Sequence, residues 1–136
     1  MQERSWSTAR VRFFKLDYDE VMQRLREYAR KMLSKKAKTV ILIGSLARGD
    51  YTAFSDADII IVHDSSRGNP VERIIDFIDP TLPVDVEPRV YTLRELIEMS
   101  RENRKIVKEI IEHGIVLAGD GKVLETLRQY YDGSNR

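Results

Sequence analysis

The sequence from residue 40 to residue 62 reads VILIGSLARGDYTAFSDADIIIV, which sets a glycine-containing turn and two aspartates between two apolar runs. Neither apolar run alternates with polar residues, so both runs are predicted to be buried, central strands of a sheet. The turn begins at Gly44, and the aspartates Asp56 and Asp58 open the second run. If these strands pair antiparallel, the turn and the aspartates meet at the same end of the sheet.

The two parts of this stretch have the chemistry of a phosphate site and a metal site. A strand that ends in Gly44 and Ser45 can offer backbone N–H groups and a hydroxyl to phosphate oxygens. Asp56 and Asp58 are two residues apart, so their carboxylates project from the same face of the strand and can share divalent cations, with magnesium best suited. Either part alone is more often a simple turn or chain reversal.

A third acidic segment follows at residues 84–87, Val-Asp-Val-Glu. Its alternation predicts a strand with Asp85 and Glu87 on one face, although a half-solvated edge strand would read the same way. We favour Asp85 as the third carboxylate, because Pro88 is expected to disturb the strand just after Glu87. Three carboxylates beside a phosphate turn are the parts of a two-metal centre for phosphoryl or nucleotidyl transfer.

Three segments together resemble a known signature: GSLARG at 44–49, SDAD at 55–58 and VDV at 84–86. They resemble the polymerase-β-like nucleotidyltransferase superfamily, and most of all the small archaeal and bacterial minimal nucleotidyltransferases. The resemblance covers roughly residues 17–119. It implies an α/β (α+β) nucleotidyltransferase fold, with a mixed β-sheet flanked by α-helices. It also implies an enzyme that transfers a nucleoside monophosphate, AMP from ATP being favoured, to a hydroxyl.

The resemblance also assigns the metal ligands. Asp56 and Asp58 would hold two magnesium ions, with manganese as an alternative metal. Asp85 would complete the ion that activates the acceptor, and Glu87 is its alternative as a ligand. These three aspartates are therefore the predicted catalytic residues.

The triphosphate, under the same resemblance, is held by Gly44, Ser45, Arg48 and Ser55. Arg48 could equally tie down its own loop by pairing with Asp50. Leu46 departs from the commonest form of the signature, which has arginine there, so one expected phosphate contact is missing.

Composition limits the architecture and the partners. A chain of 136 residues predicts one domain, with a core over about 11–119, a C-terminal helix over about 120–131 and a frayed tail at 132–136. The 23 basic and 22 acidic side chains nearly cancel, so direct nucleic-acid binding is not expected. The absence of cysteine and of long apolar stretches predicts a cytoplasmic protein without a membrane span.

Spacing and capping signals place the remaining elements. Helices are predicted from the Asp17 and Glu20 capping box, from Asn69 and Pro70, and from Thr92 to His113 with a break near Asn103. The second of these should bury a stripe of Val71, Ile74, Ile75 and Ile78. Further predicted elements are strands at 11–16, 38–43, 57–63 and 115–117 and a closing helix over 123–131.

The resemblance implies both a function and a partner. Little of the chain lies outside the resembling segment to bind an acceptor, so the acceptor is expected on another chain. In the minimal family this resembles the antitoxin of a two-gene toxin–antitoxin pair, whose partner is a HEPN-class ribonuclease and whose activity attaches AMP to a partner tyrosine. One alternative is a binding module that neutralises such a partner by contact alone. Another is a small-molecule enzyme of the aminoglycoside-modifying type, in which a homo-oligomer could complete the pocket.

Overall fold

The computed structural model describes residues 17–65 and 67–131, so the predicted strand at 11–16 and the predicted frayed tail at 132–136 lie outside the described residues. The helices are α2 (Tyr18–Ser34), α3 (Ser45–Arg48), α4 (Pro70–Arg73), α5 (Leu93–Arg101), α6 (Lys105–His113) and α7 (Lys122–Tyr130), and α4 continues into a 3₁₀ helix, η1 (Ile74–Phe77). The strands are β1 (Thr39–Ile43), β2 (Ala57–Val62), β3 (Val86–Tyr91) and β4 (Ile115–Gly119).

The four strands form one mixed sheet in the order β3-β2-β1-β4. β1 pairs antiparallel with both β2 and β4, whereas β2 and β3 run parallel. β1 and β2 therefore have neighbours on both sides, which confirms the prediction from their unbroken apolar runs that both are central.

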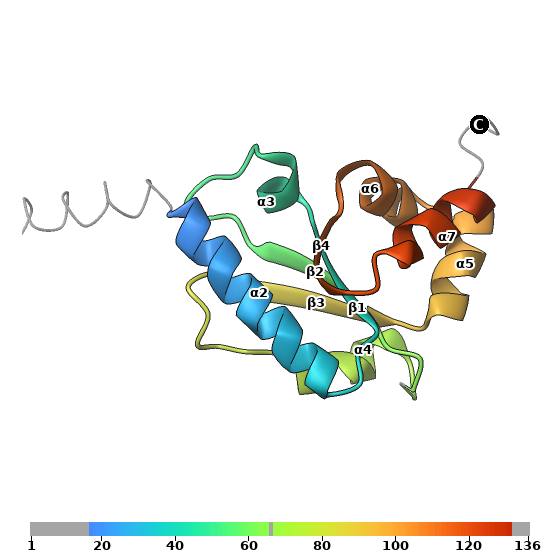
Figure 1. Ribbon diagram of the computed structural model, residues 1–136, viewed down its shortest axis with the longest axis horizontal. Helices are drawn as coiled ribbons and strands as arrows, with labels where there is room; N and C mark the ends of the chain where they lie inside the picture. Colours follow the sequence, from blue (N-terminus) through green and yellow to red (C-terminus); the bar gives the residue numbers. More distant parts are fainter. Residues whose placement is uncertain (1–16, 66, 132–136) are drawn as a thin grey trace, which may run out of the picture.

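Helices cover both faces of this sheet (Figure 1). One set of strand side chains packs with α2, namely Val40, Leu42, Ile59 and Ile61. The alternate set packs with α5, α6 and α7, namely Ile41, Ile43, Ile60 and Val62. Because apolar layers lie on both sides, all five residues of β1 are buried. The predicted fold class, a mixed sheet flanked by helices, is confirmed.

Capping residues begin and end the helices largely where the sequence predicts. The Asp17 side chain accepts a hydrogen bond from the Glu20 N–H at 3.1 Å, and Thr92 and Glu95 form a full capping box. The long helix predicted after Thr92 is broken into α5 and α6 beside Asn103, whose φ of 55° is a left-handed conformation that no α-helix continues.

The predicted burial of the segment after Asn69 is wrong for three of its four apolar residues. The start is correct, because the Asn69 side chain accepts from the Glu72 N–H at 2.9 Å. Val71 and Ile75, however, are each 75% exposed, and Ile78 is 55% exposed. The chain tightens from α4 into the 3₁₀ geometry of η1, so the assumed 3.6-residue period does not persist and Phe77 becomes the buried anchor.

The expectation that Pro88 disturbs the third strand is also wrong. β3 starts at Val86, passes through a buried Pro88 and continues to Tyr91. Pro88 lies opposite Ile59 in the parallel register. β3 is an edge strand, where a residue without an N–H is tolerated.

One arginine joins the α4 segment to β3 and α5. The side chain of Arg73 is only 8% exposed and lies 2.7 Å from a carboxylate oxygen of Glu95. It also donates to the carbonyls of Gly68 at 2.6 Å and Val90 at 3.3 Å. The hydrogen bond from Arg73 is the main cause that lowers the pKa of Glu95.

Replacing Glu95→Gln is expected to lower the free energy of unfolding by about 1 kcal/mol at neutral pH, because it removes the ion pair with Arg73. The loss is small because the Glu95 side chain is over a third exposed, so solvent screens the pair. A lowered folded-state pKa gives stability that is present above the ordinary pKa of a glutamate and is lost as the pH falls. Urea unfolding over a series of pH values should therefore show the full difference from the wild type at pH 7 and a difference that shrinks progressively as the pH falls below the ordinary glutamate pKa of about 4.3. Glu98→Gln is the control, because its pair with Arg101 is exposed on both sides; an equal loss in acid would contradict the ion-pair origin.

Candidate active site

The antiparallel register of β1 and β2 brings the turn and the aspartates together. Ile43, the last residue of β1, lies opposite Asp58, so Gly44 follows directly beside this carboxylate. The predicted antiparallel pairing is confirmed. The predicted phosphate-binding turn and the acidic start of β2, which are separated along the chain, therefore lie at one end of the sheet.

Glycine is the residue type that fits at position 44, where β1 ends and α3 begins. Its φ of 80° with ψ of −161° is a conformation that L side chains rarely adopt. A Cβ added to Gly44 would stand 2.3 Å from Oδ2 of Asp58, which is well inside van der Waals contact. The close approach of the turn to the Asp58 carboxylate therefore depends on the absence of a side chain.

Asp56 lies close to Glu87, which is on the neighbouring strand β3. Burial raises the pKa of Asp56, and a hydrogen bond with Glu87 and the repulsion of the Glu87 charge raise it further. The parallel register supports this approach, since Glu87 is the register partner of Asp58. Two carboxylates on neighbouring strands are therefore close enough at this end of the sheet to influence each other's ionisation.

Asp85, the favoured third ligand, is placed differently. It is exposed and precedes β3, and its backbone carbonyl accepts from the Ala57 N–H at 2.8 Å. Across residues 17–65 and 67–131 its side chain makes no hydrogen bond or ion pair, whereas Glu87 is close enough to Asp56 to raise its pKa. The choice between Asp85 and Glu87 as third ligand stays a prediction.

A carboxylate from α6 contacts the turn that is predicted to bind phosphate. Oε2 of Glu109 accepts from the Gly44 N–H at 3.3 Å and from Nη1 of Arg48 at 2.7 Å. Arg48 also donates to Asp50 at 3.3 Å, which is the loop-tying pair that the sequence left open. Hydrogen bonds to Glu109 and then to Asp50 raise the pKa of Arg48. Sequence reasoning missed Glu109, because a glutamate among the charged residues of a helix carries no local signal.

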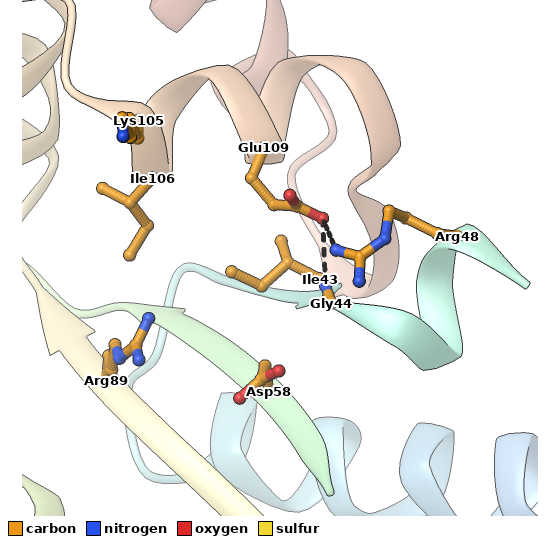
Figure 2. Close-up of a pocket in the computed structure, with 8 residues that line it drawn as sticks. All are labelled: Ile43, Gly44, Arg48, Asp58, Arg89, Lys105, Ile106 and Glu109. Carbon is orange, nitrogen blue, oxygen red and sulfur yellow. Dashed lines mark hydrogen bonds and ion pairs between the residues drawn. The ribbon is translucent and has the colours of Figure 1, made fainter. Parts of the chain in front are cut away.

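These groups line a cavity of about 280 Å³ between the sheet and α6 (Figure 2). Gly44, Arg48 and Glu109 lie at one end, and Asp58 projects from β2 into the same space. The remaining lining residues are Ile43, Arg89, Lys105 and Ile106. The sequence predicted the turn and Asp58 at this place, but it gave no signal for the residues of α6 or for Arg89.

Comparison with known proteins shows the family to which the chain belongs. The family model described as "Nucleotidyltransferase domain" matches residues 22–117, which is most of the chain and includes β1, β2 and β3. The chain belongs to the nucleotidyltransferase domain family. The predicted family membership is confirmed, and the cavity lies where this domain brings the turn to the acidic strands.

One curated relative matches a shorter part of the chain than the family model does. A protein of Methanocaldococcus jannaschii, named "Putative protein adenylyltransferase MJ0604", is 49% identical over 43 residues. Those residues are 29% of this chain and 43% of the relative, less than half of its length. Two solved structures align over 85% of this chain and 87% of their own: a toxin–antitoxin with AMP-PNP, at 18% identity and a TM-score of 0.45, and a mutant of the toxin–antitoxin MntA-HpeT, at 16% and 0.42.

The donor atoms of this nucleotidyltransferase domain suit magnesium in kind. Carboxylate oxygens are the hard ligands that magnesium prefers, and a cation would relieve the repulsion that raises the pKa of Asp56. Across residues 17–65 and 67–131, however, no three acidic, histidine or cysteine side chains lie close enough together to hold one ion. Asp58 lies against Gly44 while Asp56 contacts Glu87, so metal binding requires these side chains to rotate toward one another.

The other predicted phosphate residues have structural surroundings of their own. Ser45 begins α3 next to the cavity but is not among its lining residues. The Ser55 hydroxyl accepts from the Thr52 N–H at 2.8 Å and so shapes the loop before β2. Leu46 is fully buried in the core and is not among the residues that line the cavity.

The nucleotide binding predicted from the sequence is expected to be abolished by Gly44→Ala, because the new Cβ collides with the Asp58 carboxylate. Gly49→Ala is a matched control. Gly49 also has a positive φ, 92°, but a Cβ there meets nothing within 4 Å. The control should lose about 1–2 kcal/mol of stability through backbone strain while keeping nucleotide binding, as thermal melts and calorimetric titration would show. Equal binding by both variants would contradict the requirement for close approach.

Replacing Glu87→Gln is expected to lower the pKa of Asp56, because the variant removes the repelling charge and offers an amide N–H to the carboxylate. Carboxyl carbon shifts followed by NMR across a pH titration would measure the change. Asp85 lies two residues before Glu87 and directly precedes β3. The variant Asp85→Asn should leave the pKa of Asp56 nearly unaltered. The reverse pattern would favour Asp85 as the neighbour of Asp56.

Proposed function

We propose that this chain is a magnesium-dependent nucleotidyltransferase that moves AMP from ATP to a hydroxyl on a partner protein. The observation that carries the proposal is the packing of the Gly44 turn against Asp58, with Asp56 and Glu87 alongside. A turn that can bind phosphate beside carboxylates that can bind a metal ion is the arrangement that nucleotidyl transfer uses. Membership of the nucleotidyltransferase domain family supports the reaction class.

In the proposed reaction the acceptor oxygen forms a bond to the α-phosphorus, the bond to the pyrophosphate oxygen breaks, and the hydroxyl proton is released. The Gly44 N–H and Arg48 would bind phosphate oxygens in place of Glu109. Asp56, Asp58 and Glu87, with Asp85 as the alternative to Glu87, would hold magnesium. Bound magnesium would supply charge neutralisation for the leaving group and activation of the hydroxyl. The covering α6 would limit the access of water on one side.

The acceptor is proposed to be a protein side chain. The cavity is about 280 Å³, at the lower limit of the usual size for ligand pockets, so the acceptor must approach from outside it. The name of the Methanocaldococcus jannaschii relative, a protein adenylyltransferase, supports a protein acceptor. We propose a HEPN-class toxin as the partner, as the sequence resemblance implies, and the cytoplasm as the place of action.

No helix within the described residues is long and apolar enough to cross a membrane.

Calorimetric titration with ATP in magnesium is expected to show binding that requires the metal. The double variant Asp56→Asn with Asp58→Asn should largely abolish this binding, because it removes two of the anionic ligands. Asp19→Asn with Asp76→Asn is a matched control, because both residues are exposed and neither lines the cavity. Unchanged binding by the first double variant would exclude the metal assignment.

Transfer itself is read by intact mass measurement of a co-purified partner incubated with ATP and magnesium. A gain of one AMP on the partner, absent with the Asp56→Asn and Asp58→Asn chain, supports adenylylation. A stable complex whose mass does not change would favour the alternative, a module that neutralises its partner by contact. The bond between Glu109 and the Gly44 turn is the observation that keeps this alternative open.

A further inference from the structure

The cavity between the sheet and α6 has two ends of different charge. At one end Arg48 is bound by two carboxylates, Glu109 and Asp50. At the other end, away from Arg48, Arg89 comes from β3 and Lys105 from the start of α6 (Figure 2). The two ends are joined along α6 by a single helical turn, since Lys105 and Glu109 are four residues apart.

Arg89 and Lys105 are the cations of this cavity that the protein leaves unneutralised. Within residues 17–65 and 67–131, neither side chain makes a recorded hydrogen bond or ion pair, and both residues are exposed. Arg89 lies two residues beyond Glu87 on the same face of β3, about 7 Å along the strand. The acidic groups near the Gly44 turn are therefore followed, along the cavity, by two unpaired positive charges.

We infer that Arg89 and Lys105 bind the phosphate chain of the nucleotide, an inference that rests on the proposed function of the cavity. The guanidinium of Arg89 offers paired N–H donors that match two phosphate oxygens, while Lys105 adds a point charge from the opposite wall. A cavity of about 280 Å³ is small for a whole nucleotide but suits its polyphosphate part. The assignment supplies the cationic phosphate contact that Leu46 does not provide, from residues that the family signature does not include.

The phosphate assignment predicts that ATP and inorganic tripolyphosphate are recognised by the same two side chains. Calorimetric titration of the full chain in magnesium would compare the wild type with Arg89→Gln, Lys105→Gln and the double variant. The double variant should bind both ligands at least about tenfold more weakly, because two charge-assisted contacts are lost. Lys108→Gln, an exposed lysine on α6 outside the cavity, and Arg94→Gln, an exposed arginine on α5, are the matched controls and should stay within about twofold.

The outcomes separate this inference from the proposed function. Binding of ATP by the double variant with wild-type affinity overturns the phosphate role of Arg89 and Lys105 but leaves the proposed function standing. No binding of ATP or tripolyphosphate by the wild type overturns both. Thermal melts establish that the variants are folded, and Arg89→Lys, which keeps the charge without the paired donors, should recover part of the affinity lost in Arg89→Gln.

Discussion

The site depends on one constraint, the contact between the Gly44 turn and the Asp58 carboxylate that the register of β1 and β2 imposes. A shift of one residue in this pairing would turn Asp58 toward α2 and into the apolar core. The apolar residues of the two strands prevent such a shift, because alternate side chains fill cores on opposite faces of the sheet. Core packing and site geometry are therefore the same constraint, and hydrophobic burial holds the acidic groups beside the turn.

Most of the fold could be predicted because its signals are local. The unbroken apolar runs of β1 and β2, the capping side chains Asp17 and Thr92, and the break beside Asn103 each depend on neighbours along the chain. The errors arose where burial or strand continuity depends on the three-dimensional surroundings of a residue. The sequence pattern predicts that Ile75 is buried, but the chain tightens into the 3₁₀ helix η1 and the pattern does not hold. The sequence also predicts that Pro88 disturbs its strand, but β3 lies at the edge of the described sheet, where proline is tolerated.

The candidate site divides in the same way. Gly44 and Asp58 could be placed together from the sequence because one stretch contains the turn, the return loop and the second strand, whereas the approach of Asp56 to Glu87 could not. Glu109 and Arg89 reach the cavity through α6 and β3, and their place depends on how these elements pack rather than on any pattern of residues. The third carboxylate lies between these cases, since alternation puts Asp85 and Glu87 on one face but only the structure shows which of them approaches Asp56.

The bond of Glu109 to the Gly44 turn makes this carboxylate a tethered competitor for every anion that approaches. A group fixed on α6 has a high effective concentration at the turn, far above that of a simple ion in solution. A monovalent anion such as chloride brings a single charge, so we expect it to compete poorly with a carboxylate that is attached to the fold. A ligand that makes several contacts at once is expected to displace Glu109 more readily, so the helix that covers the cavity would favour multiply charged ligands at the turn.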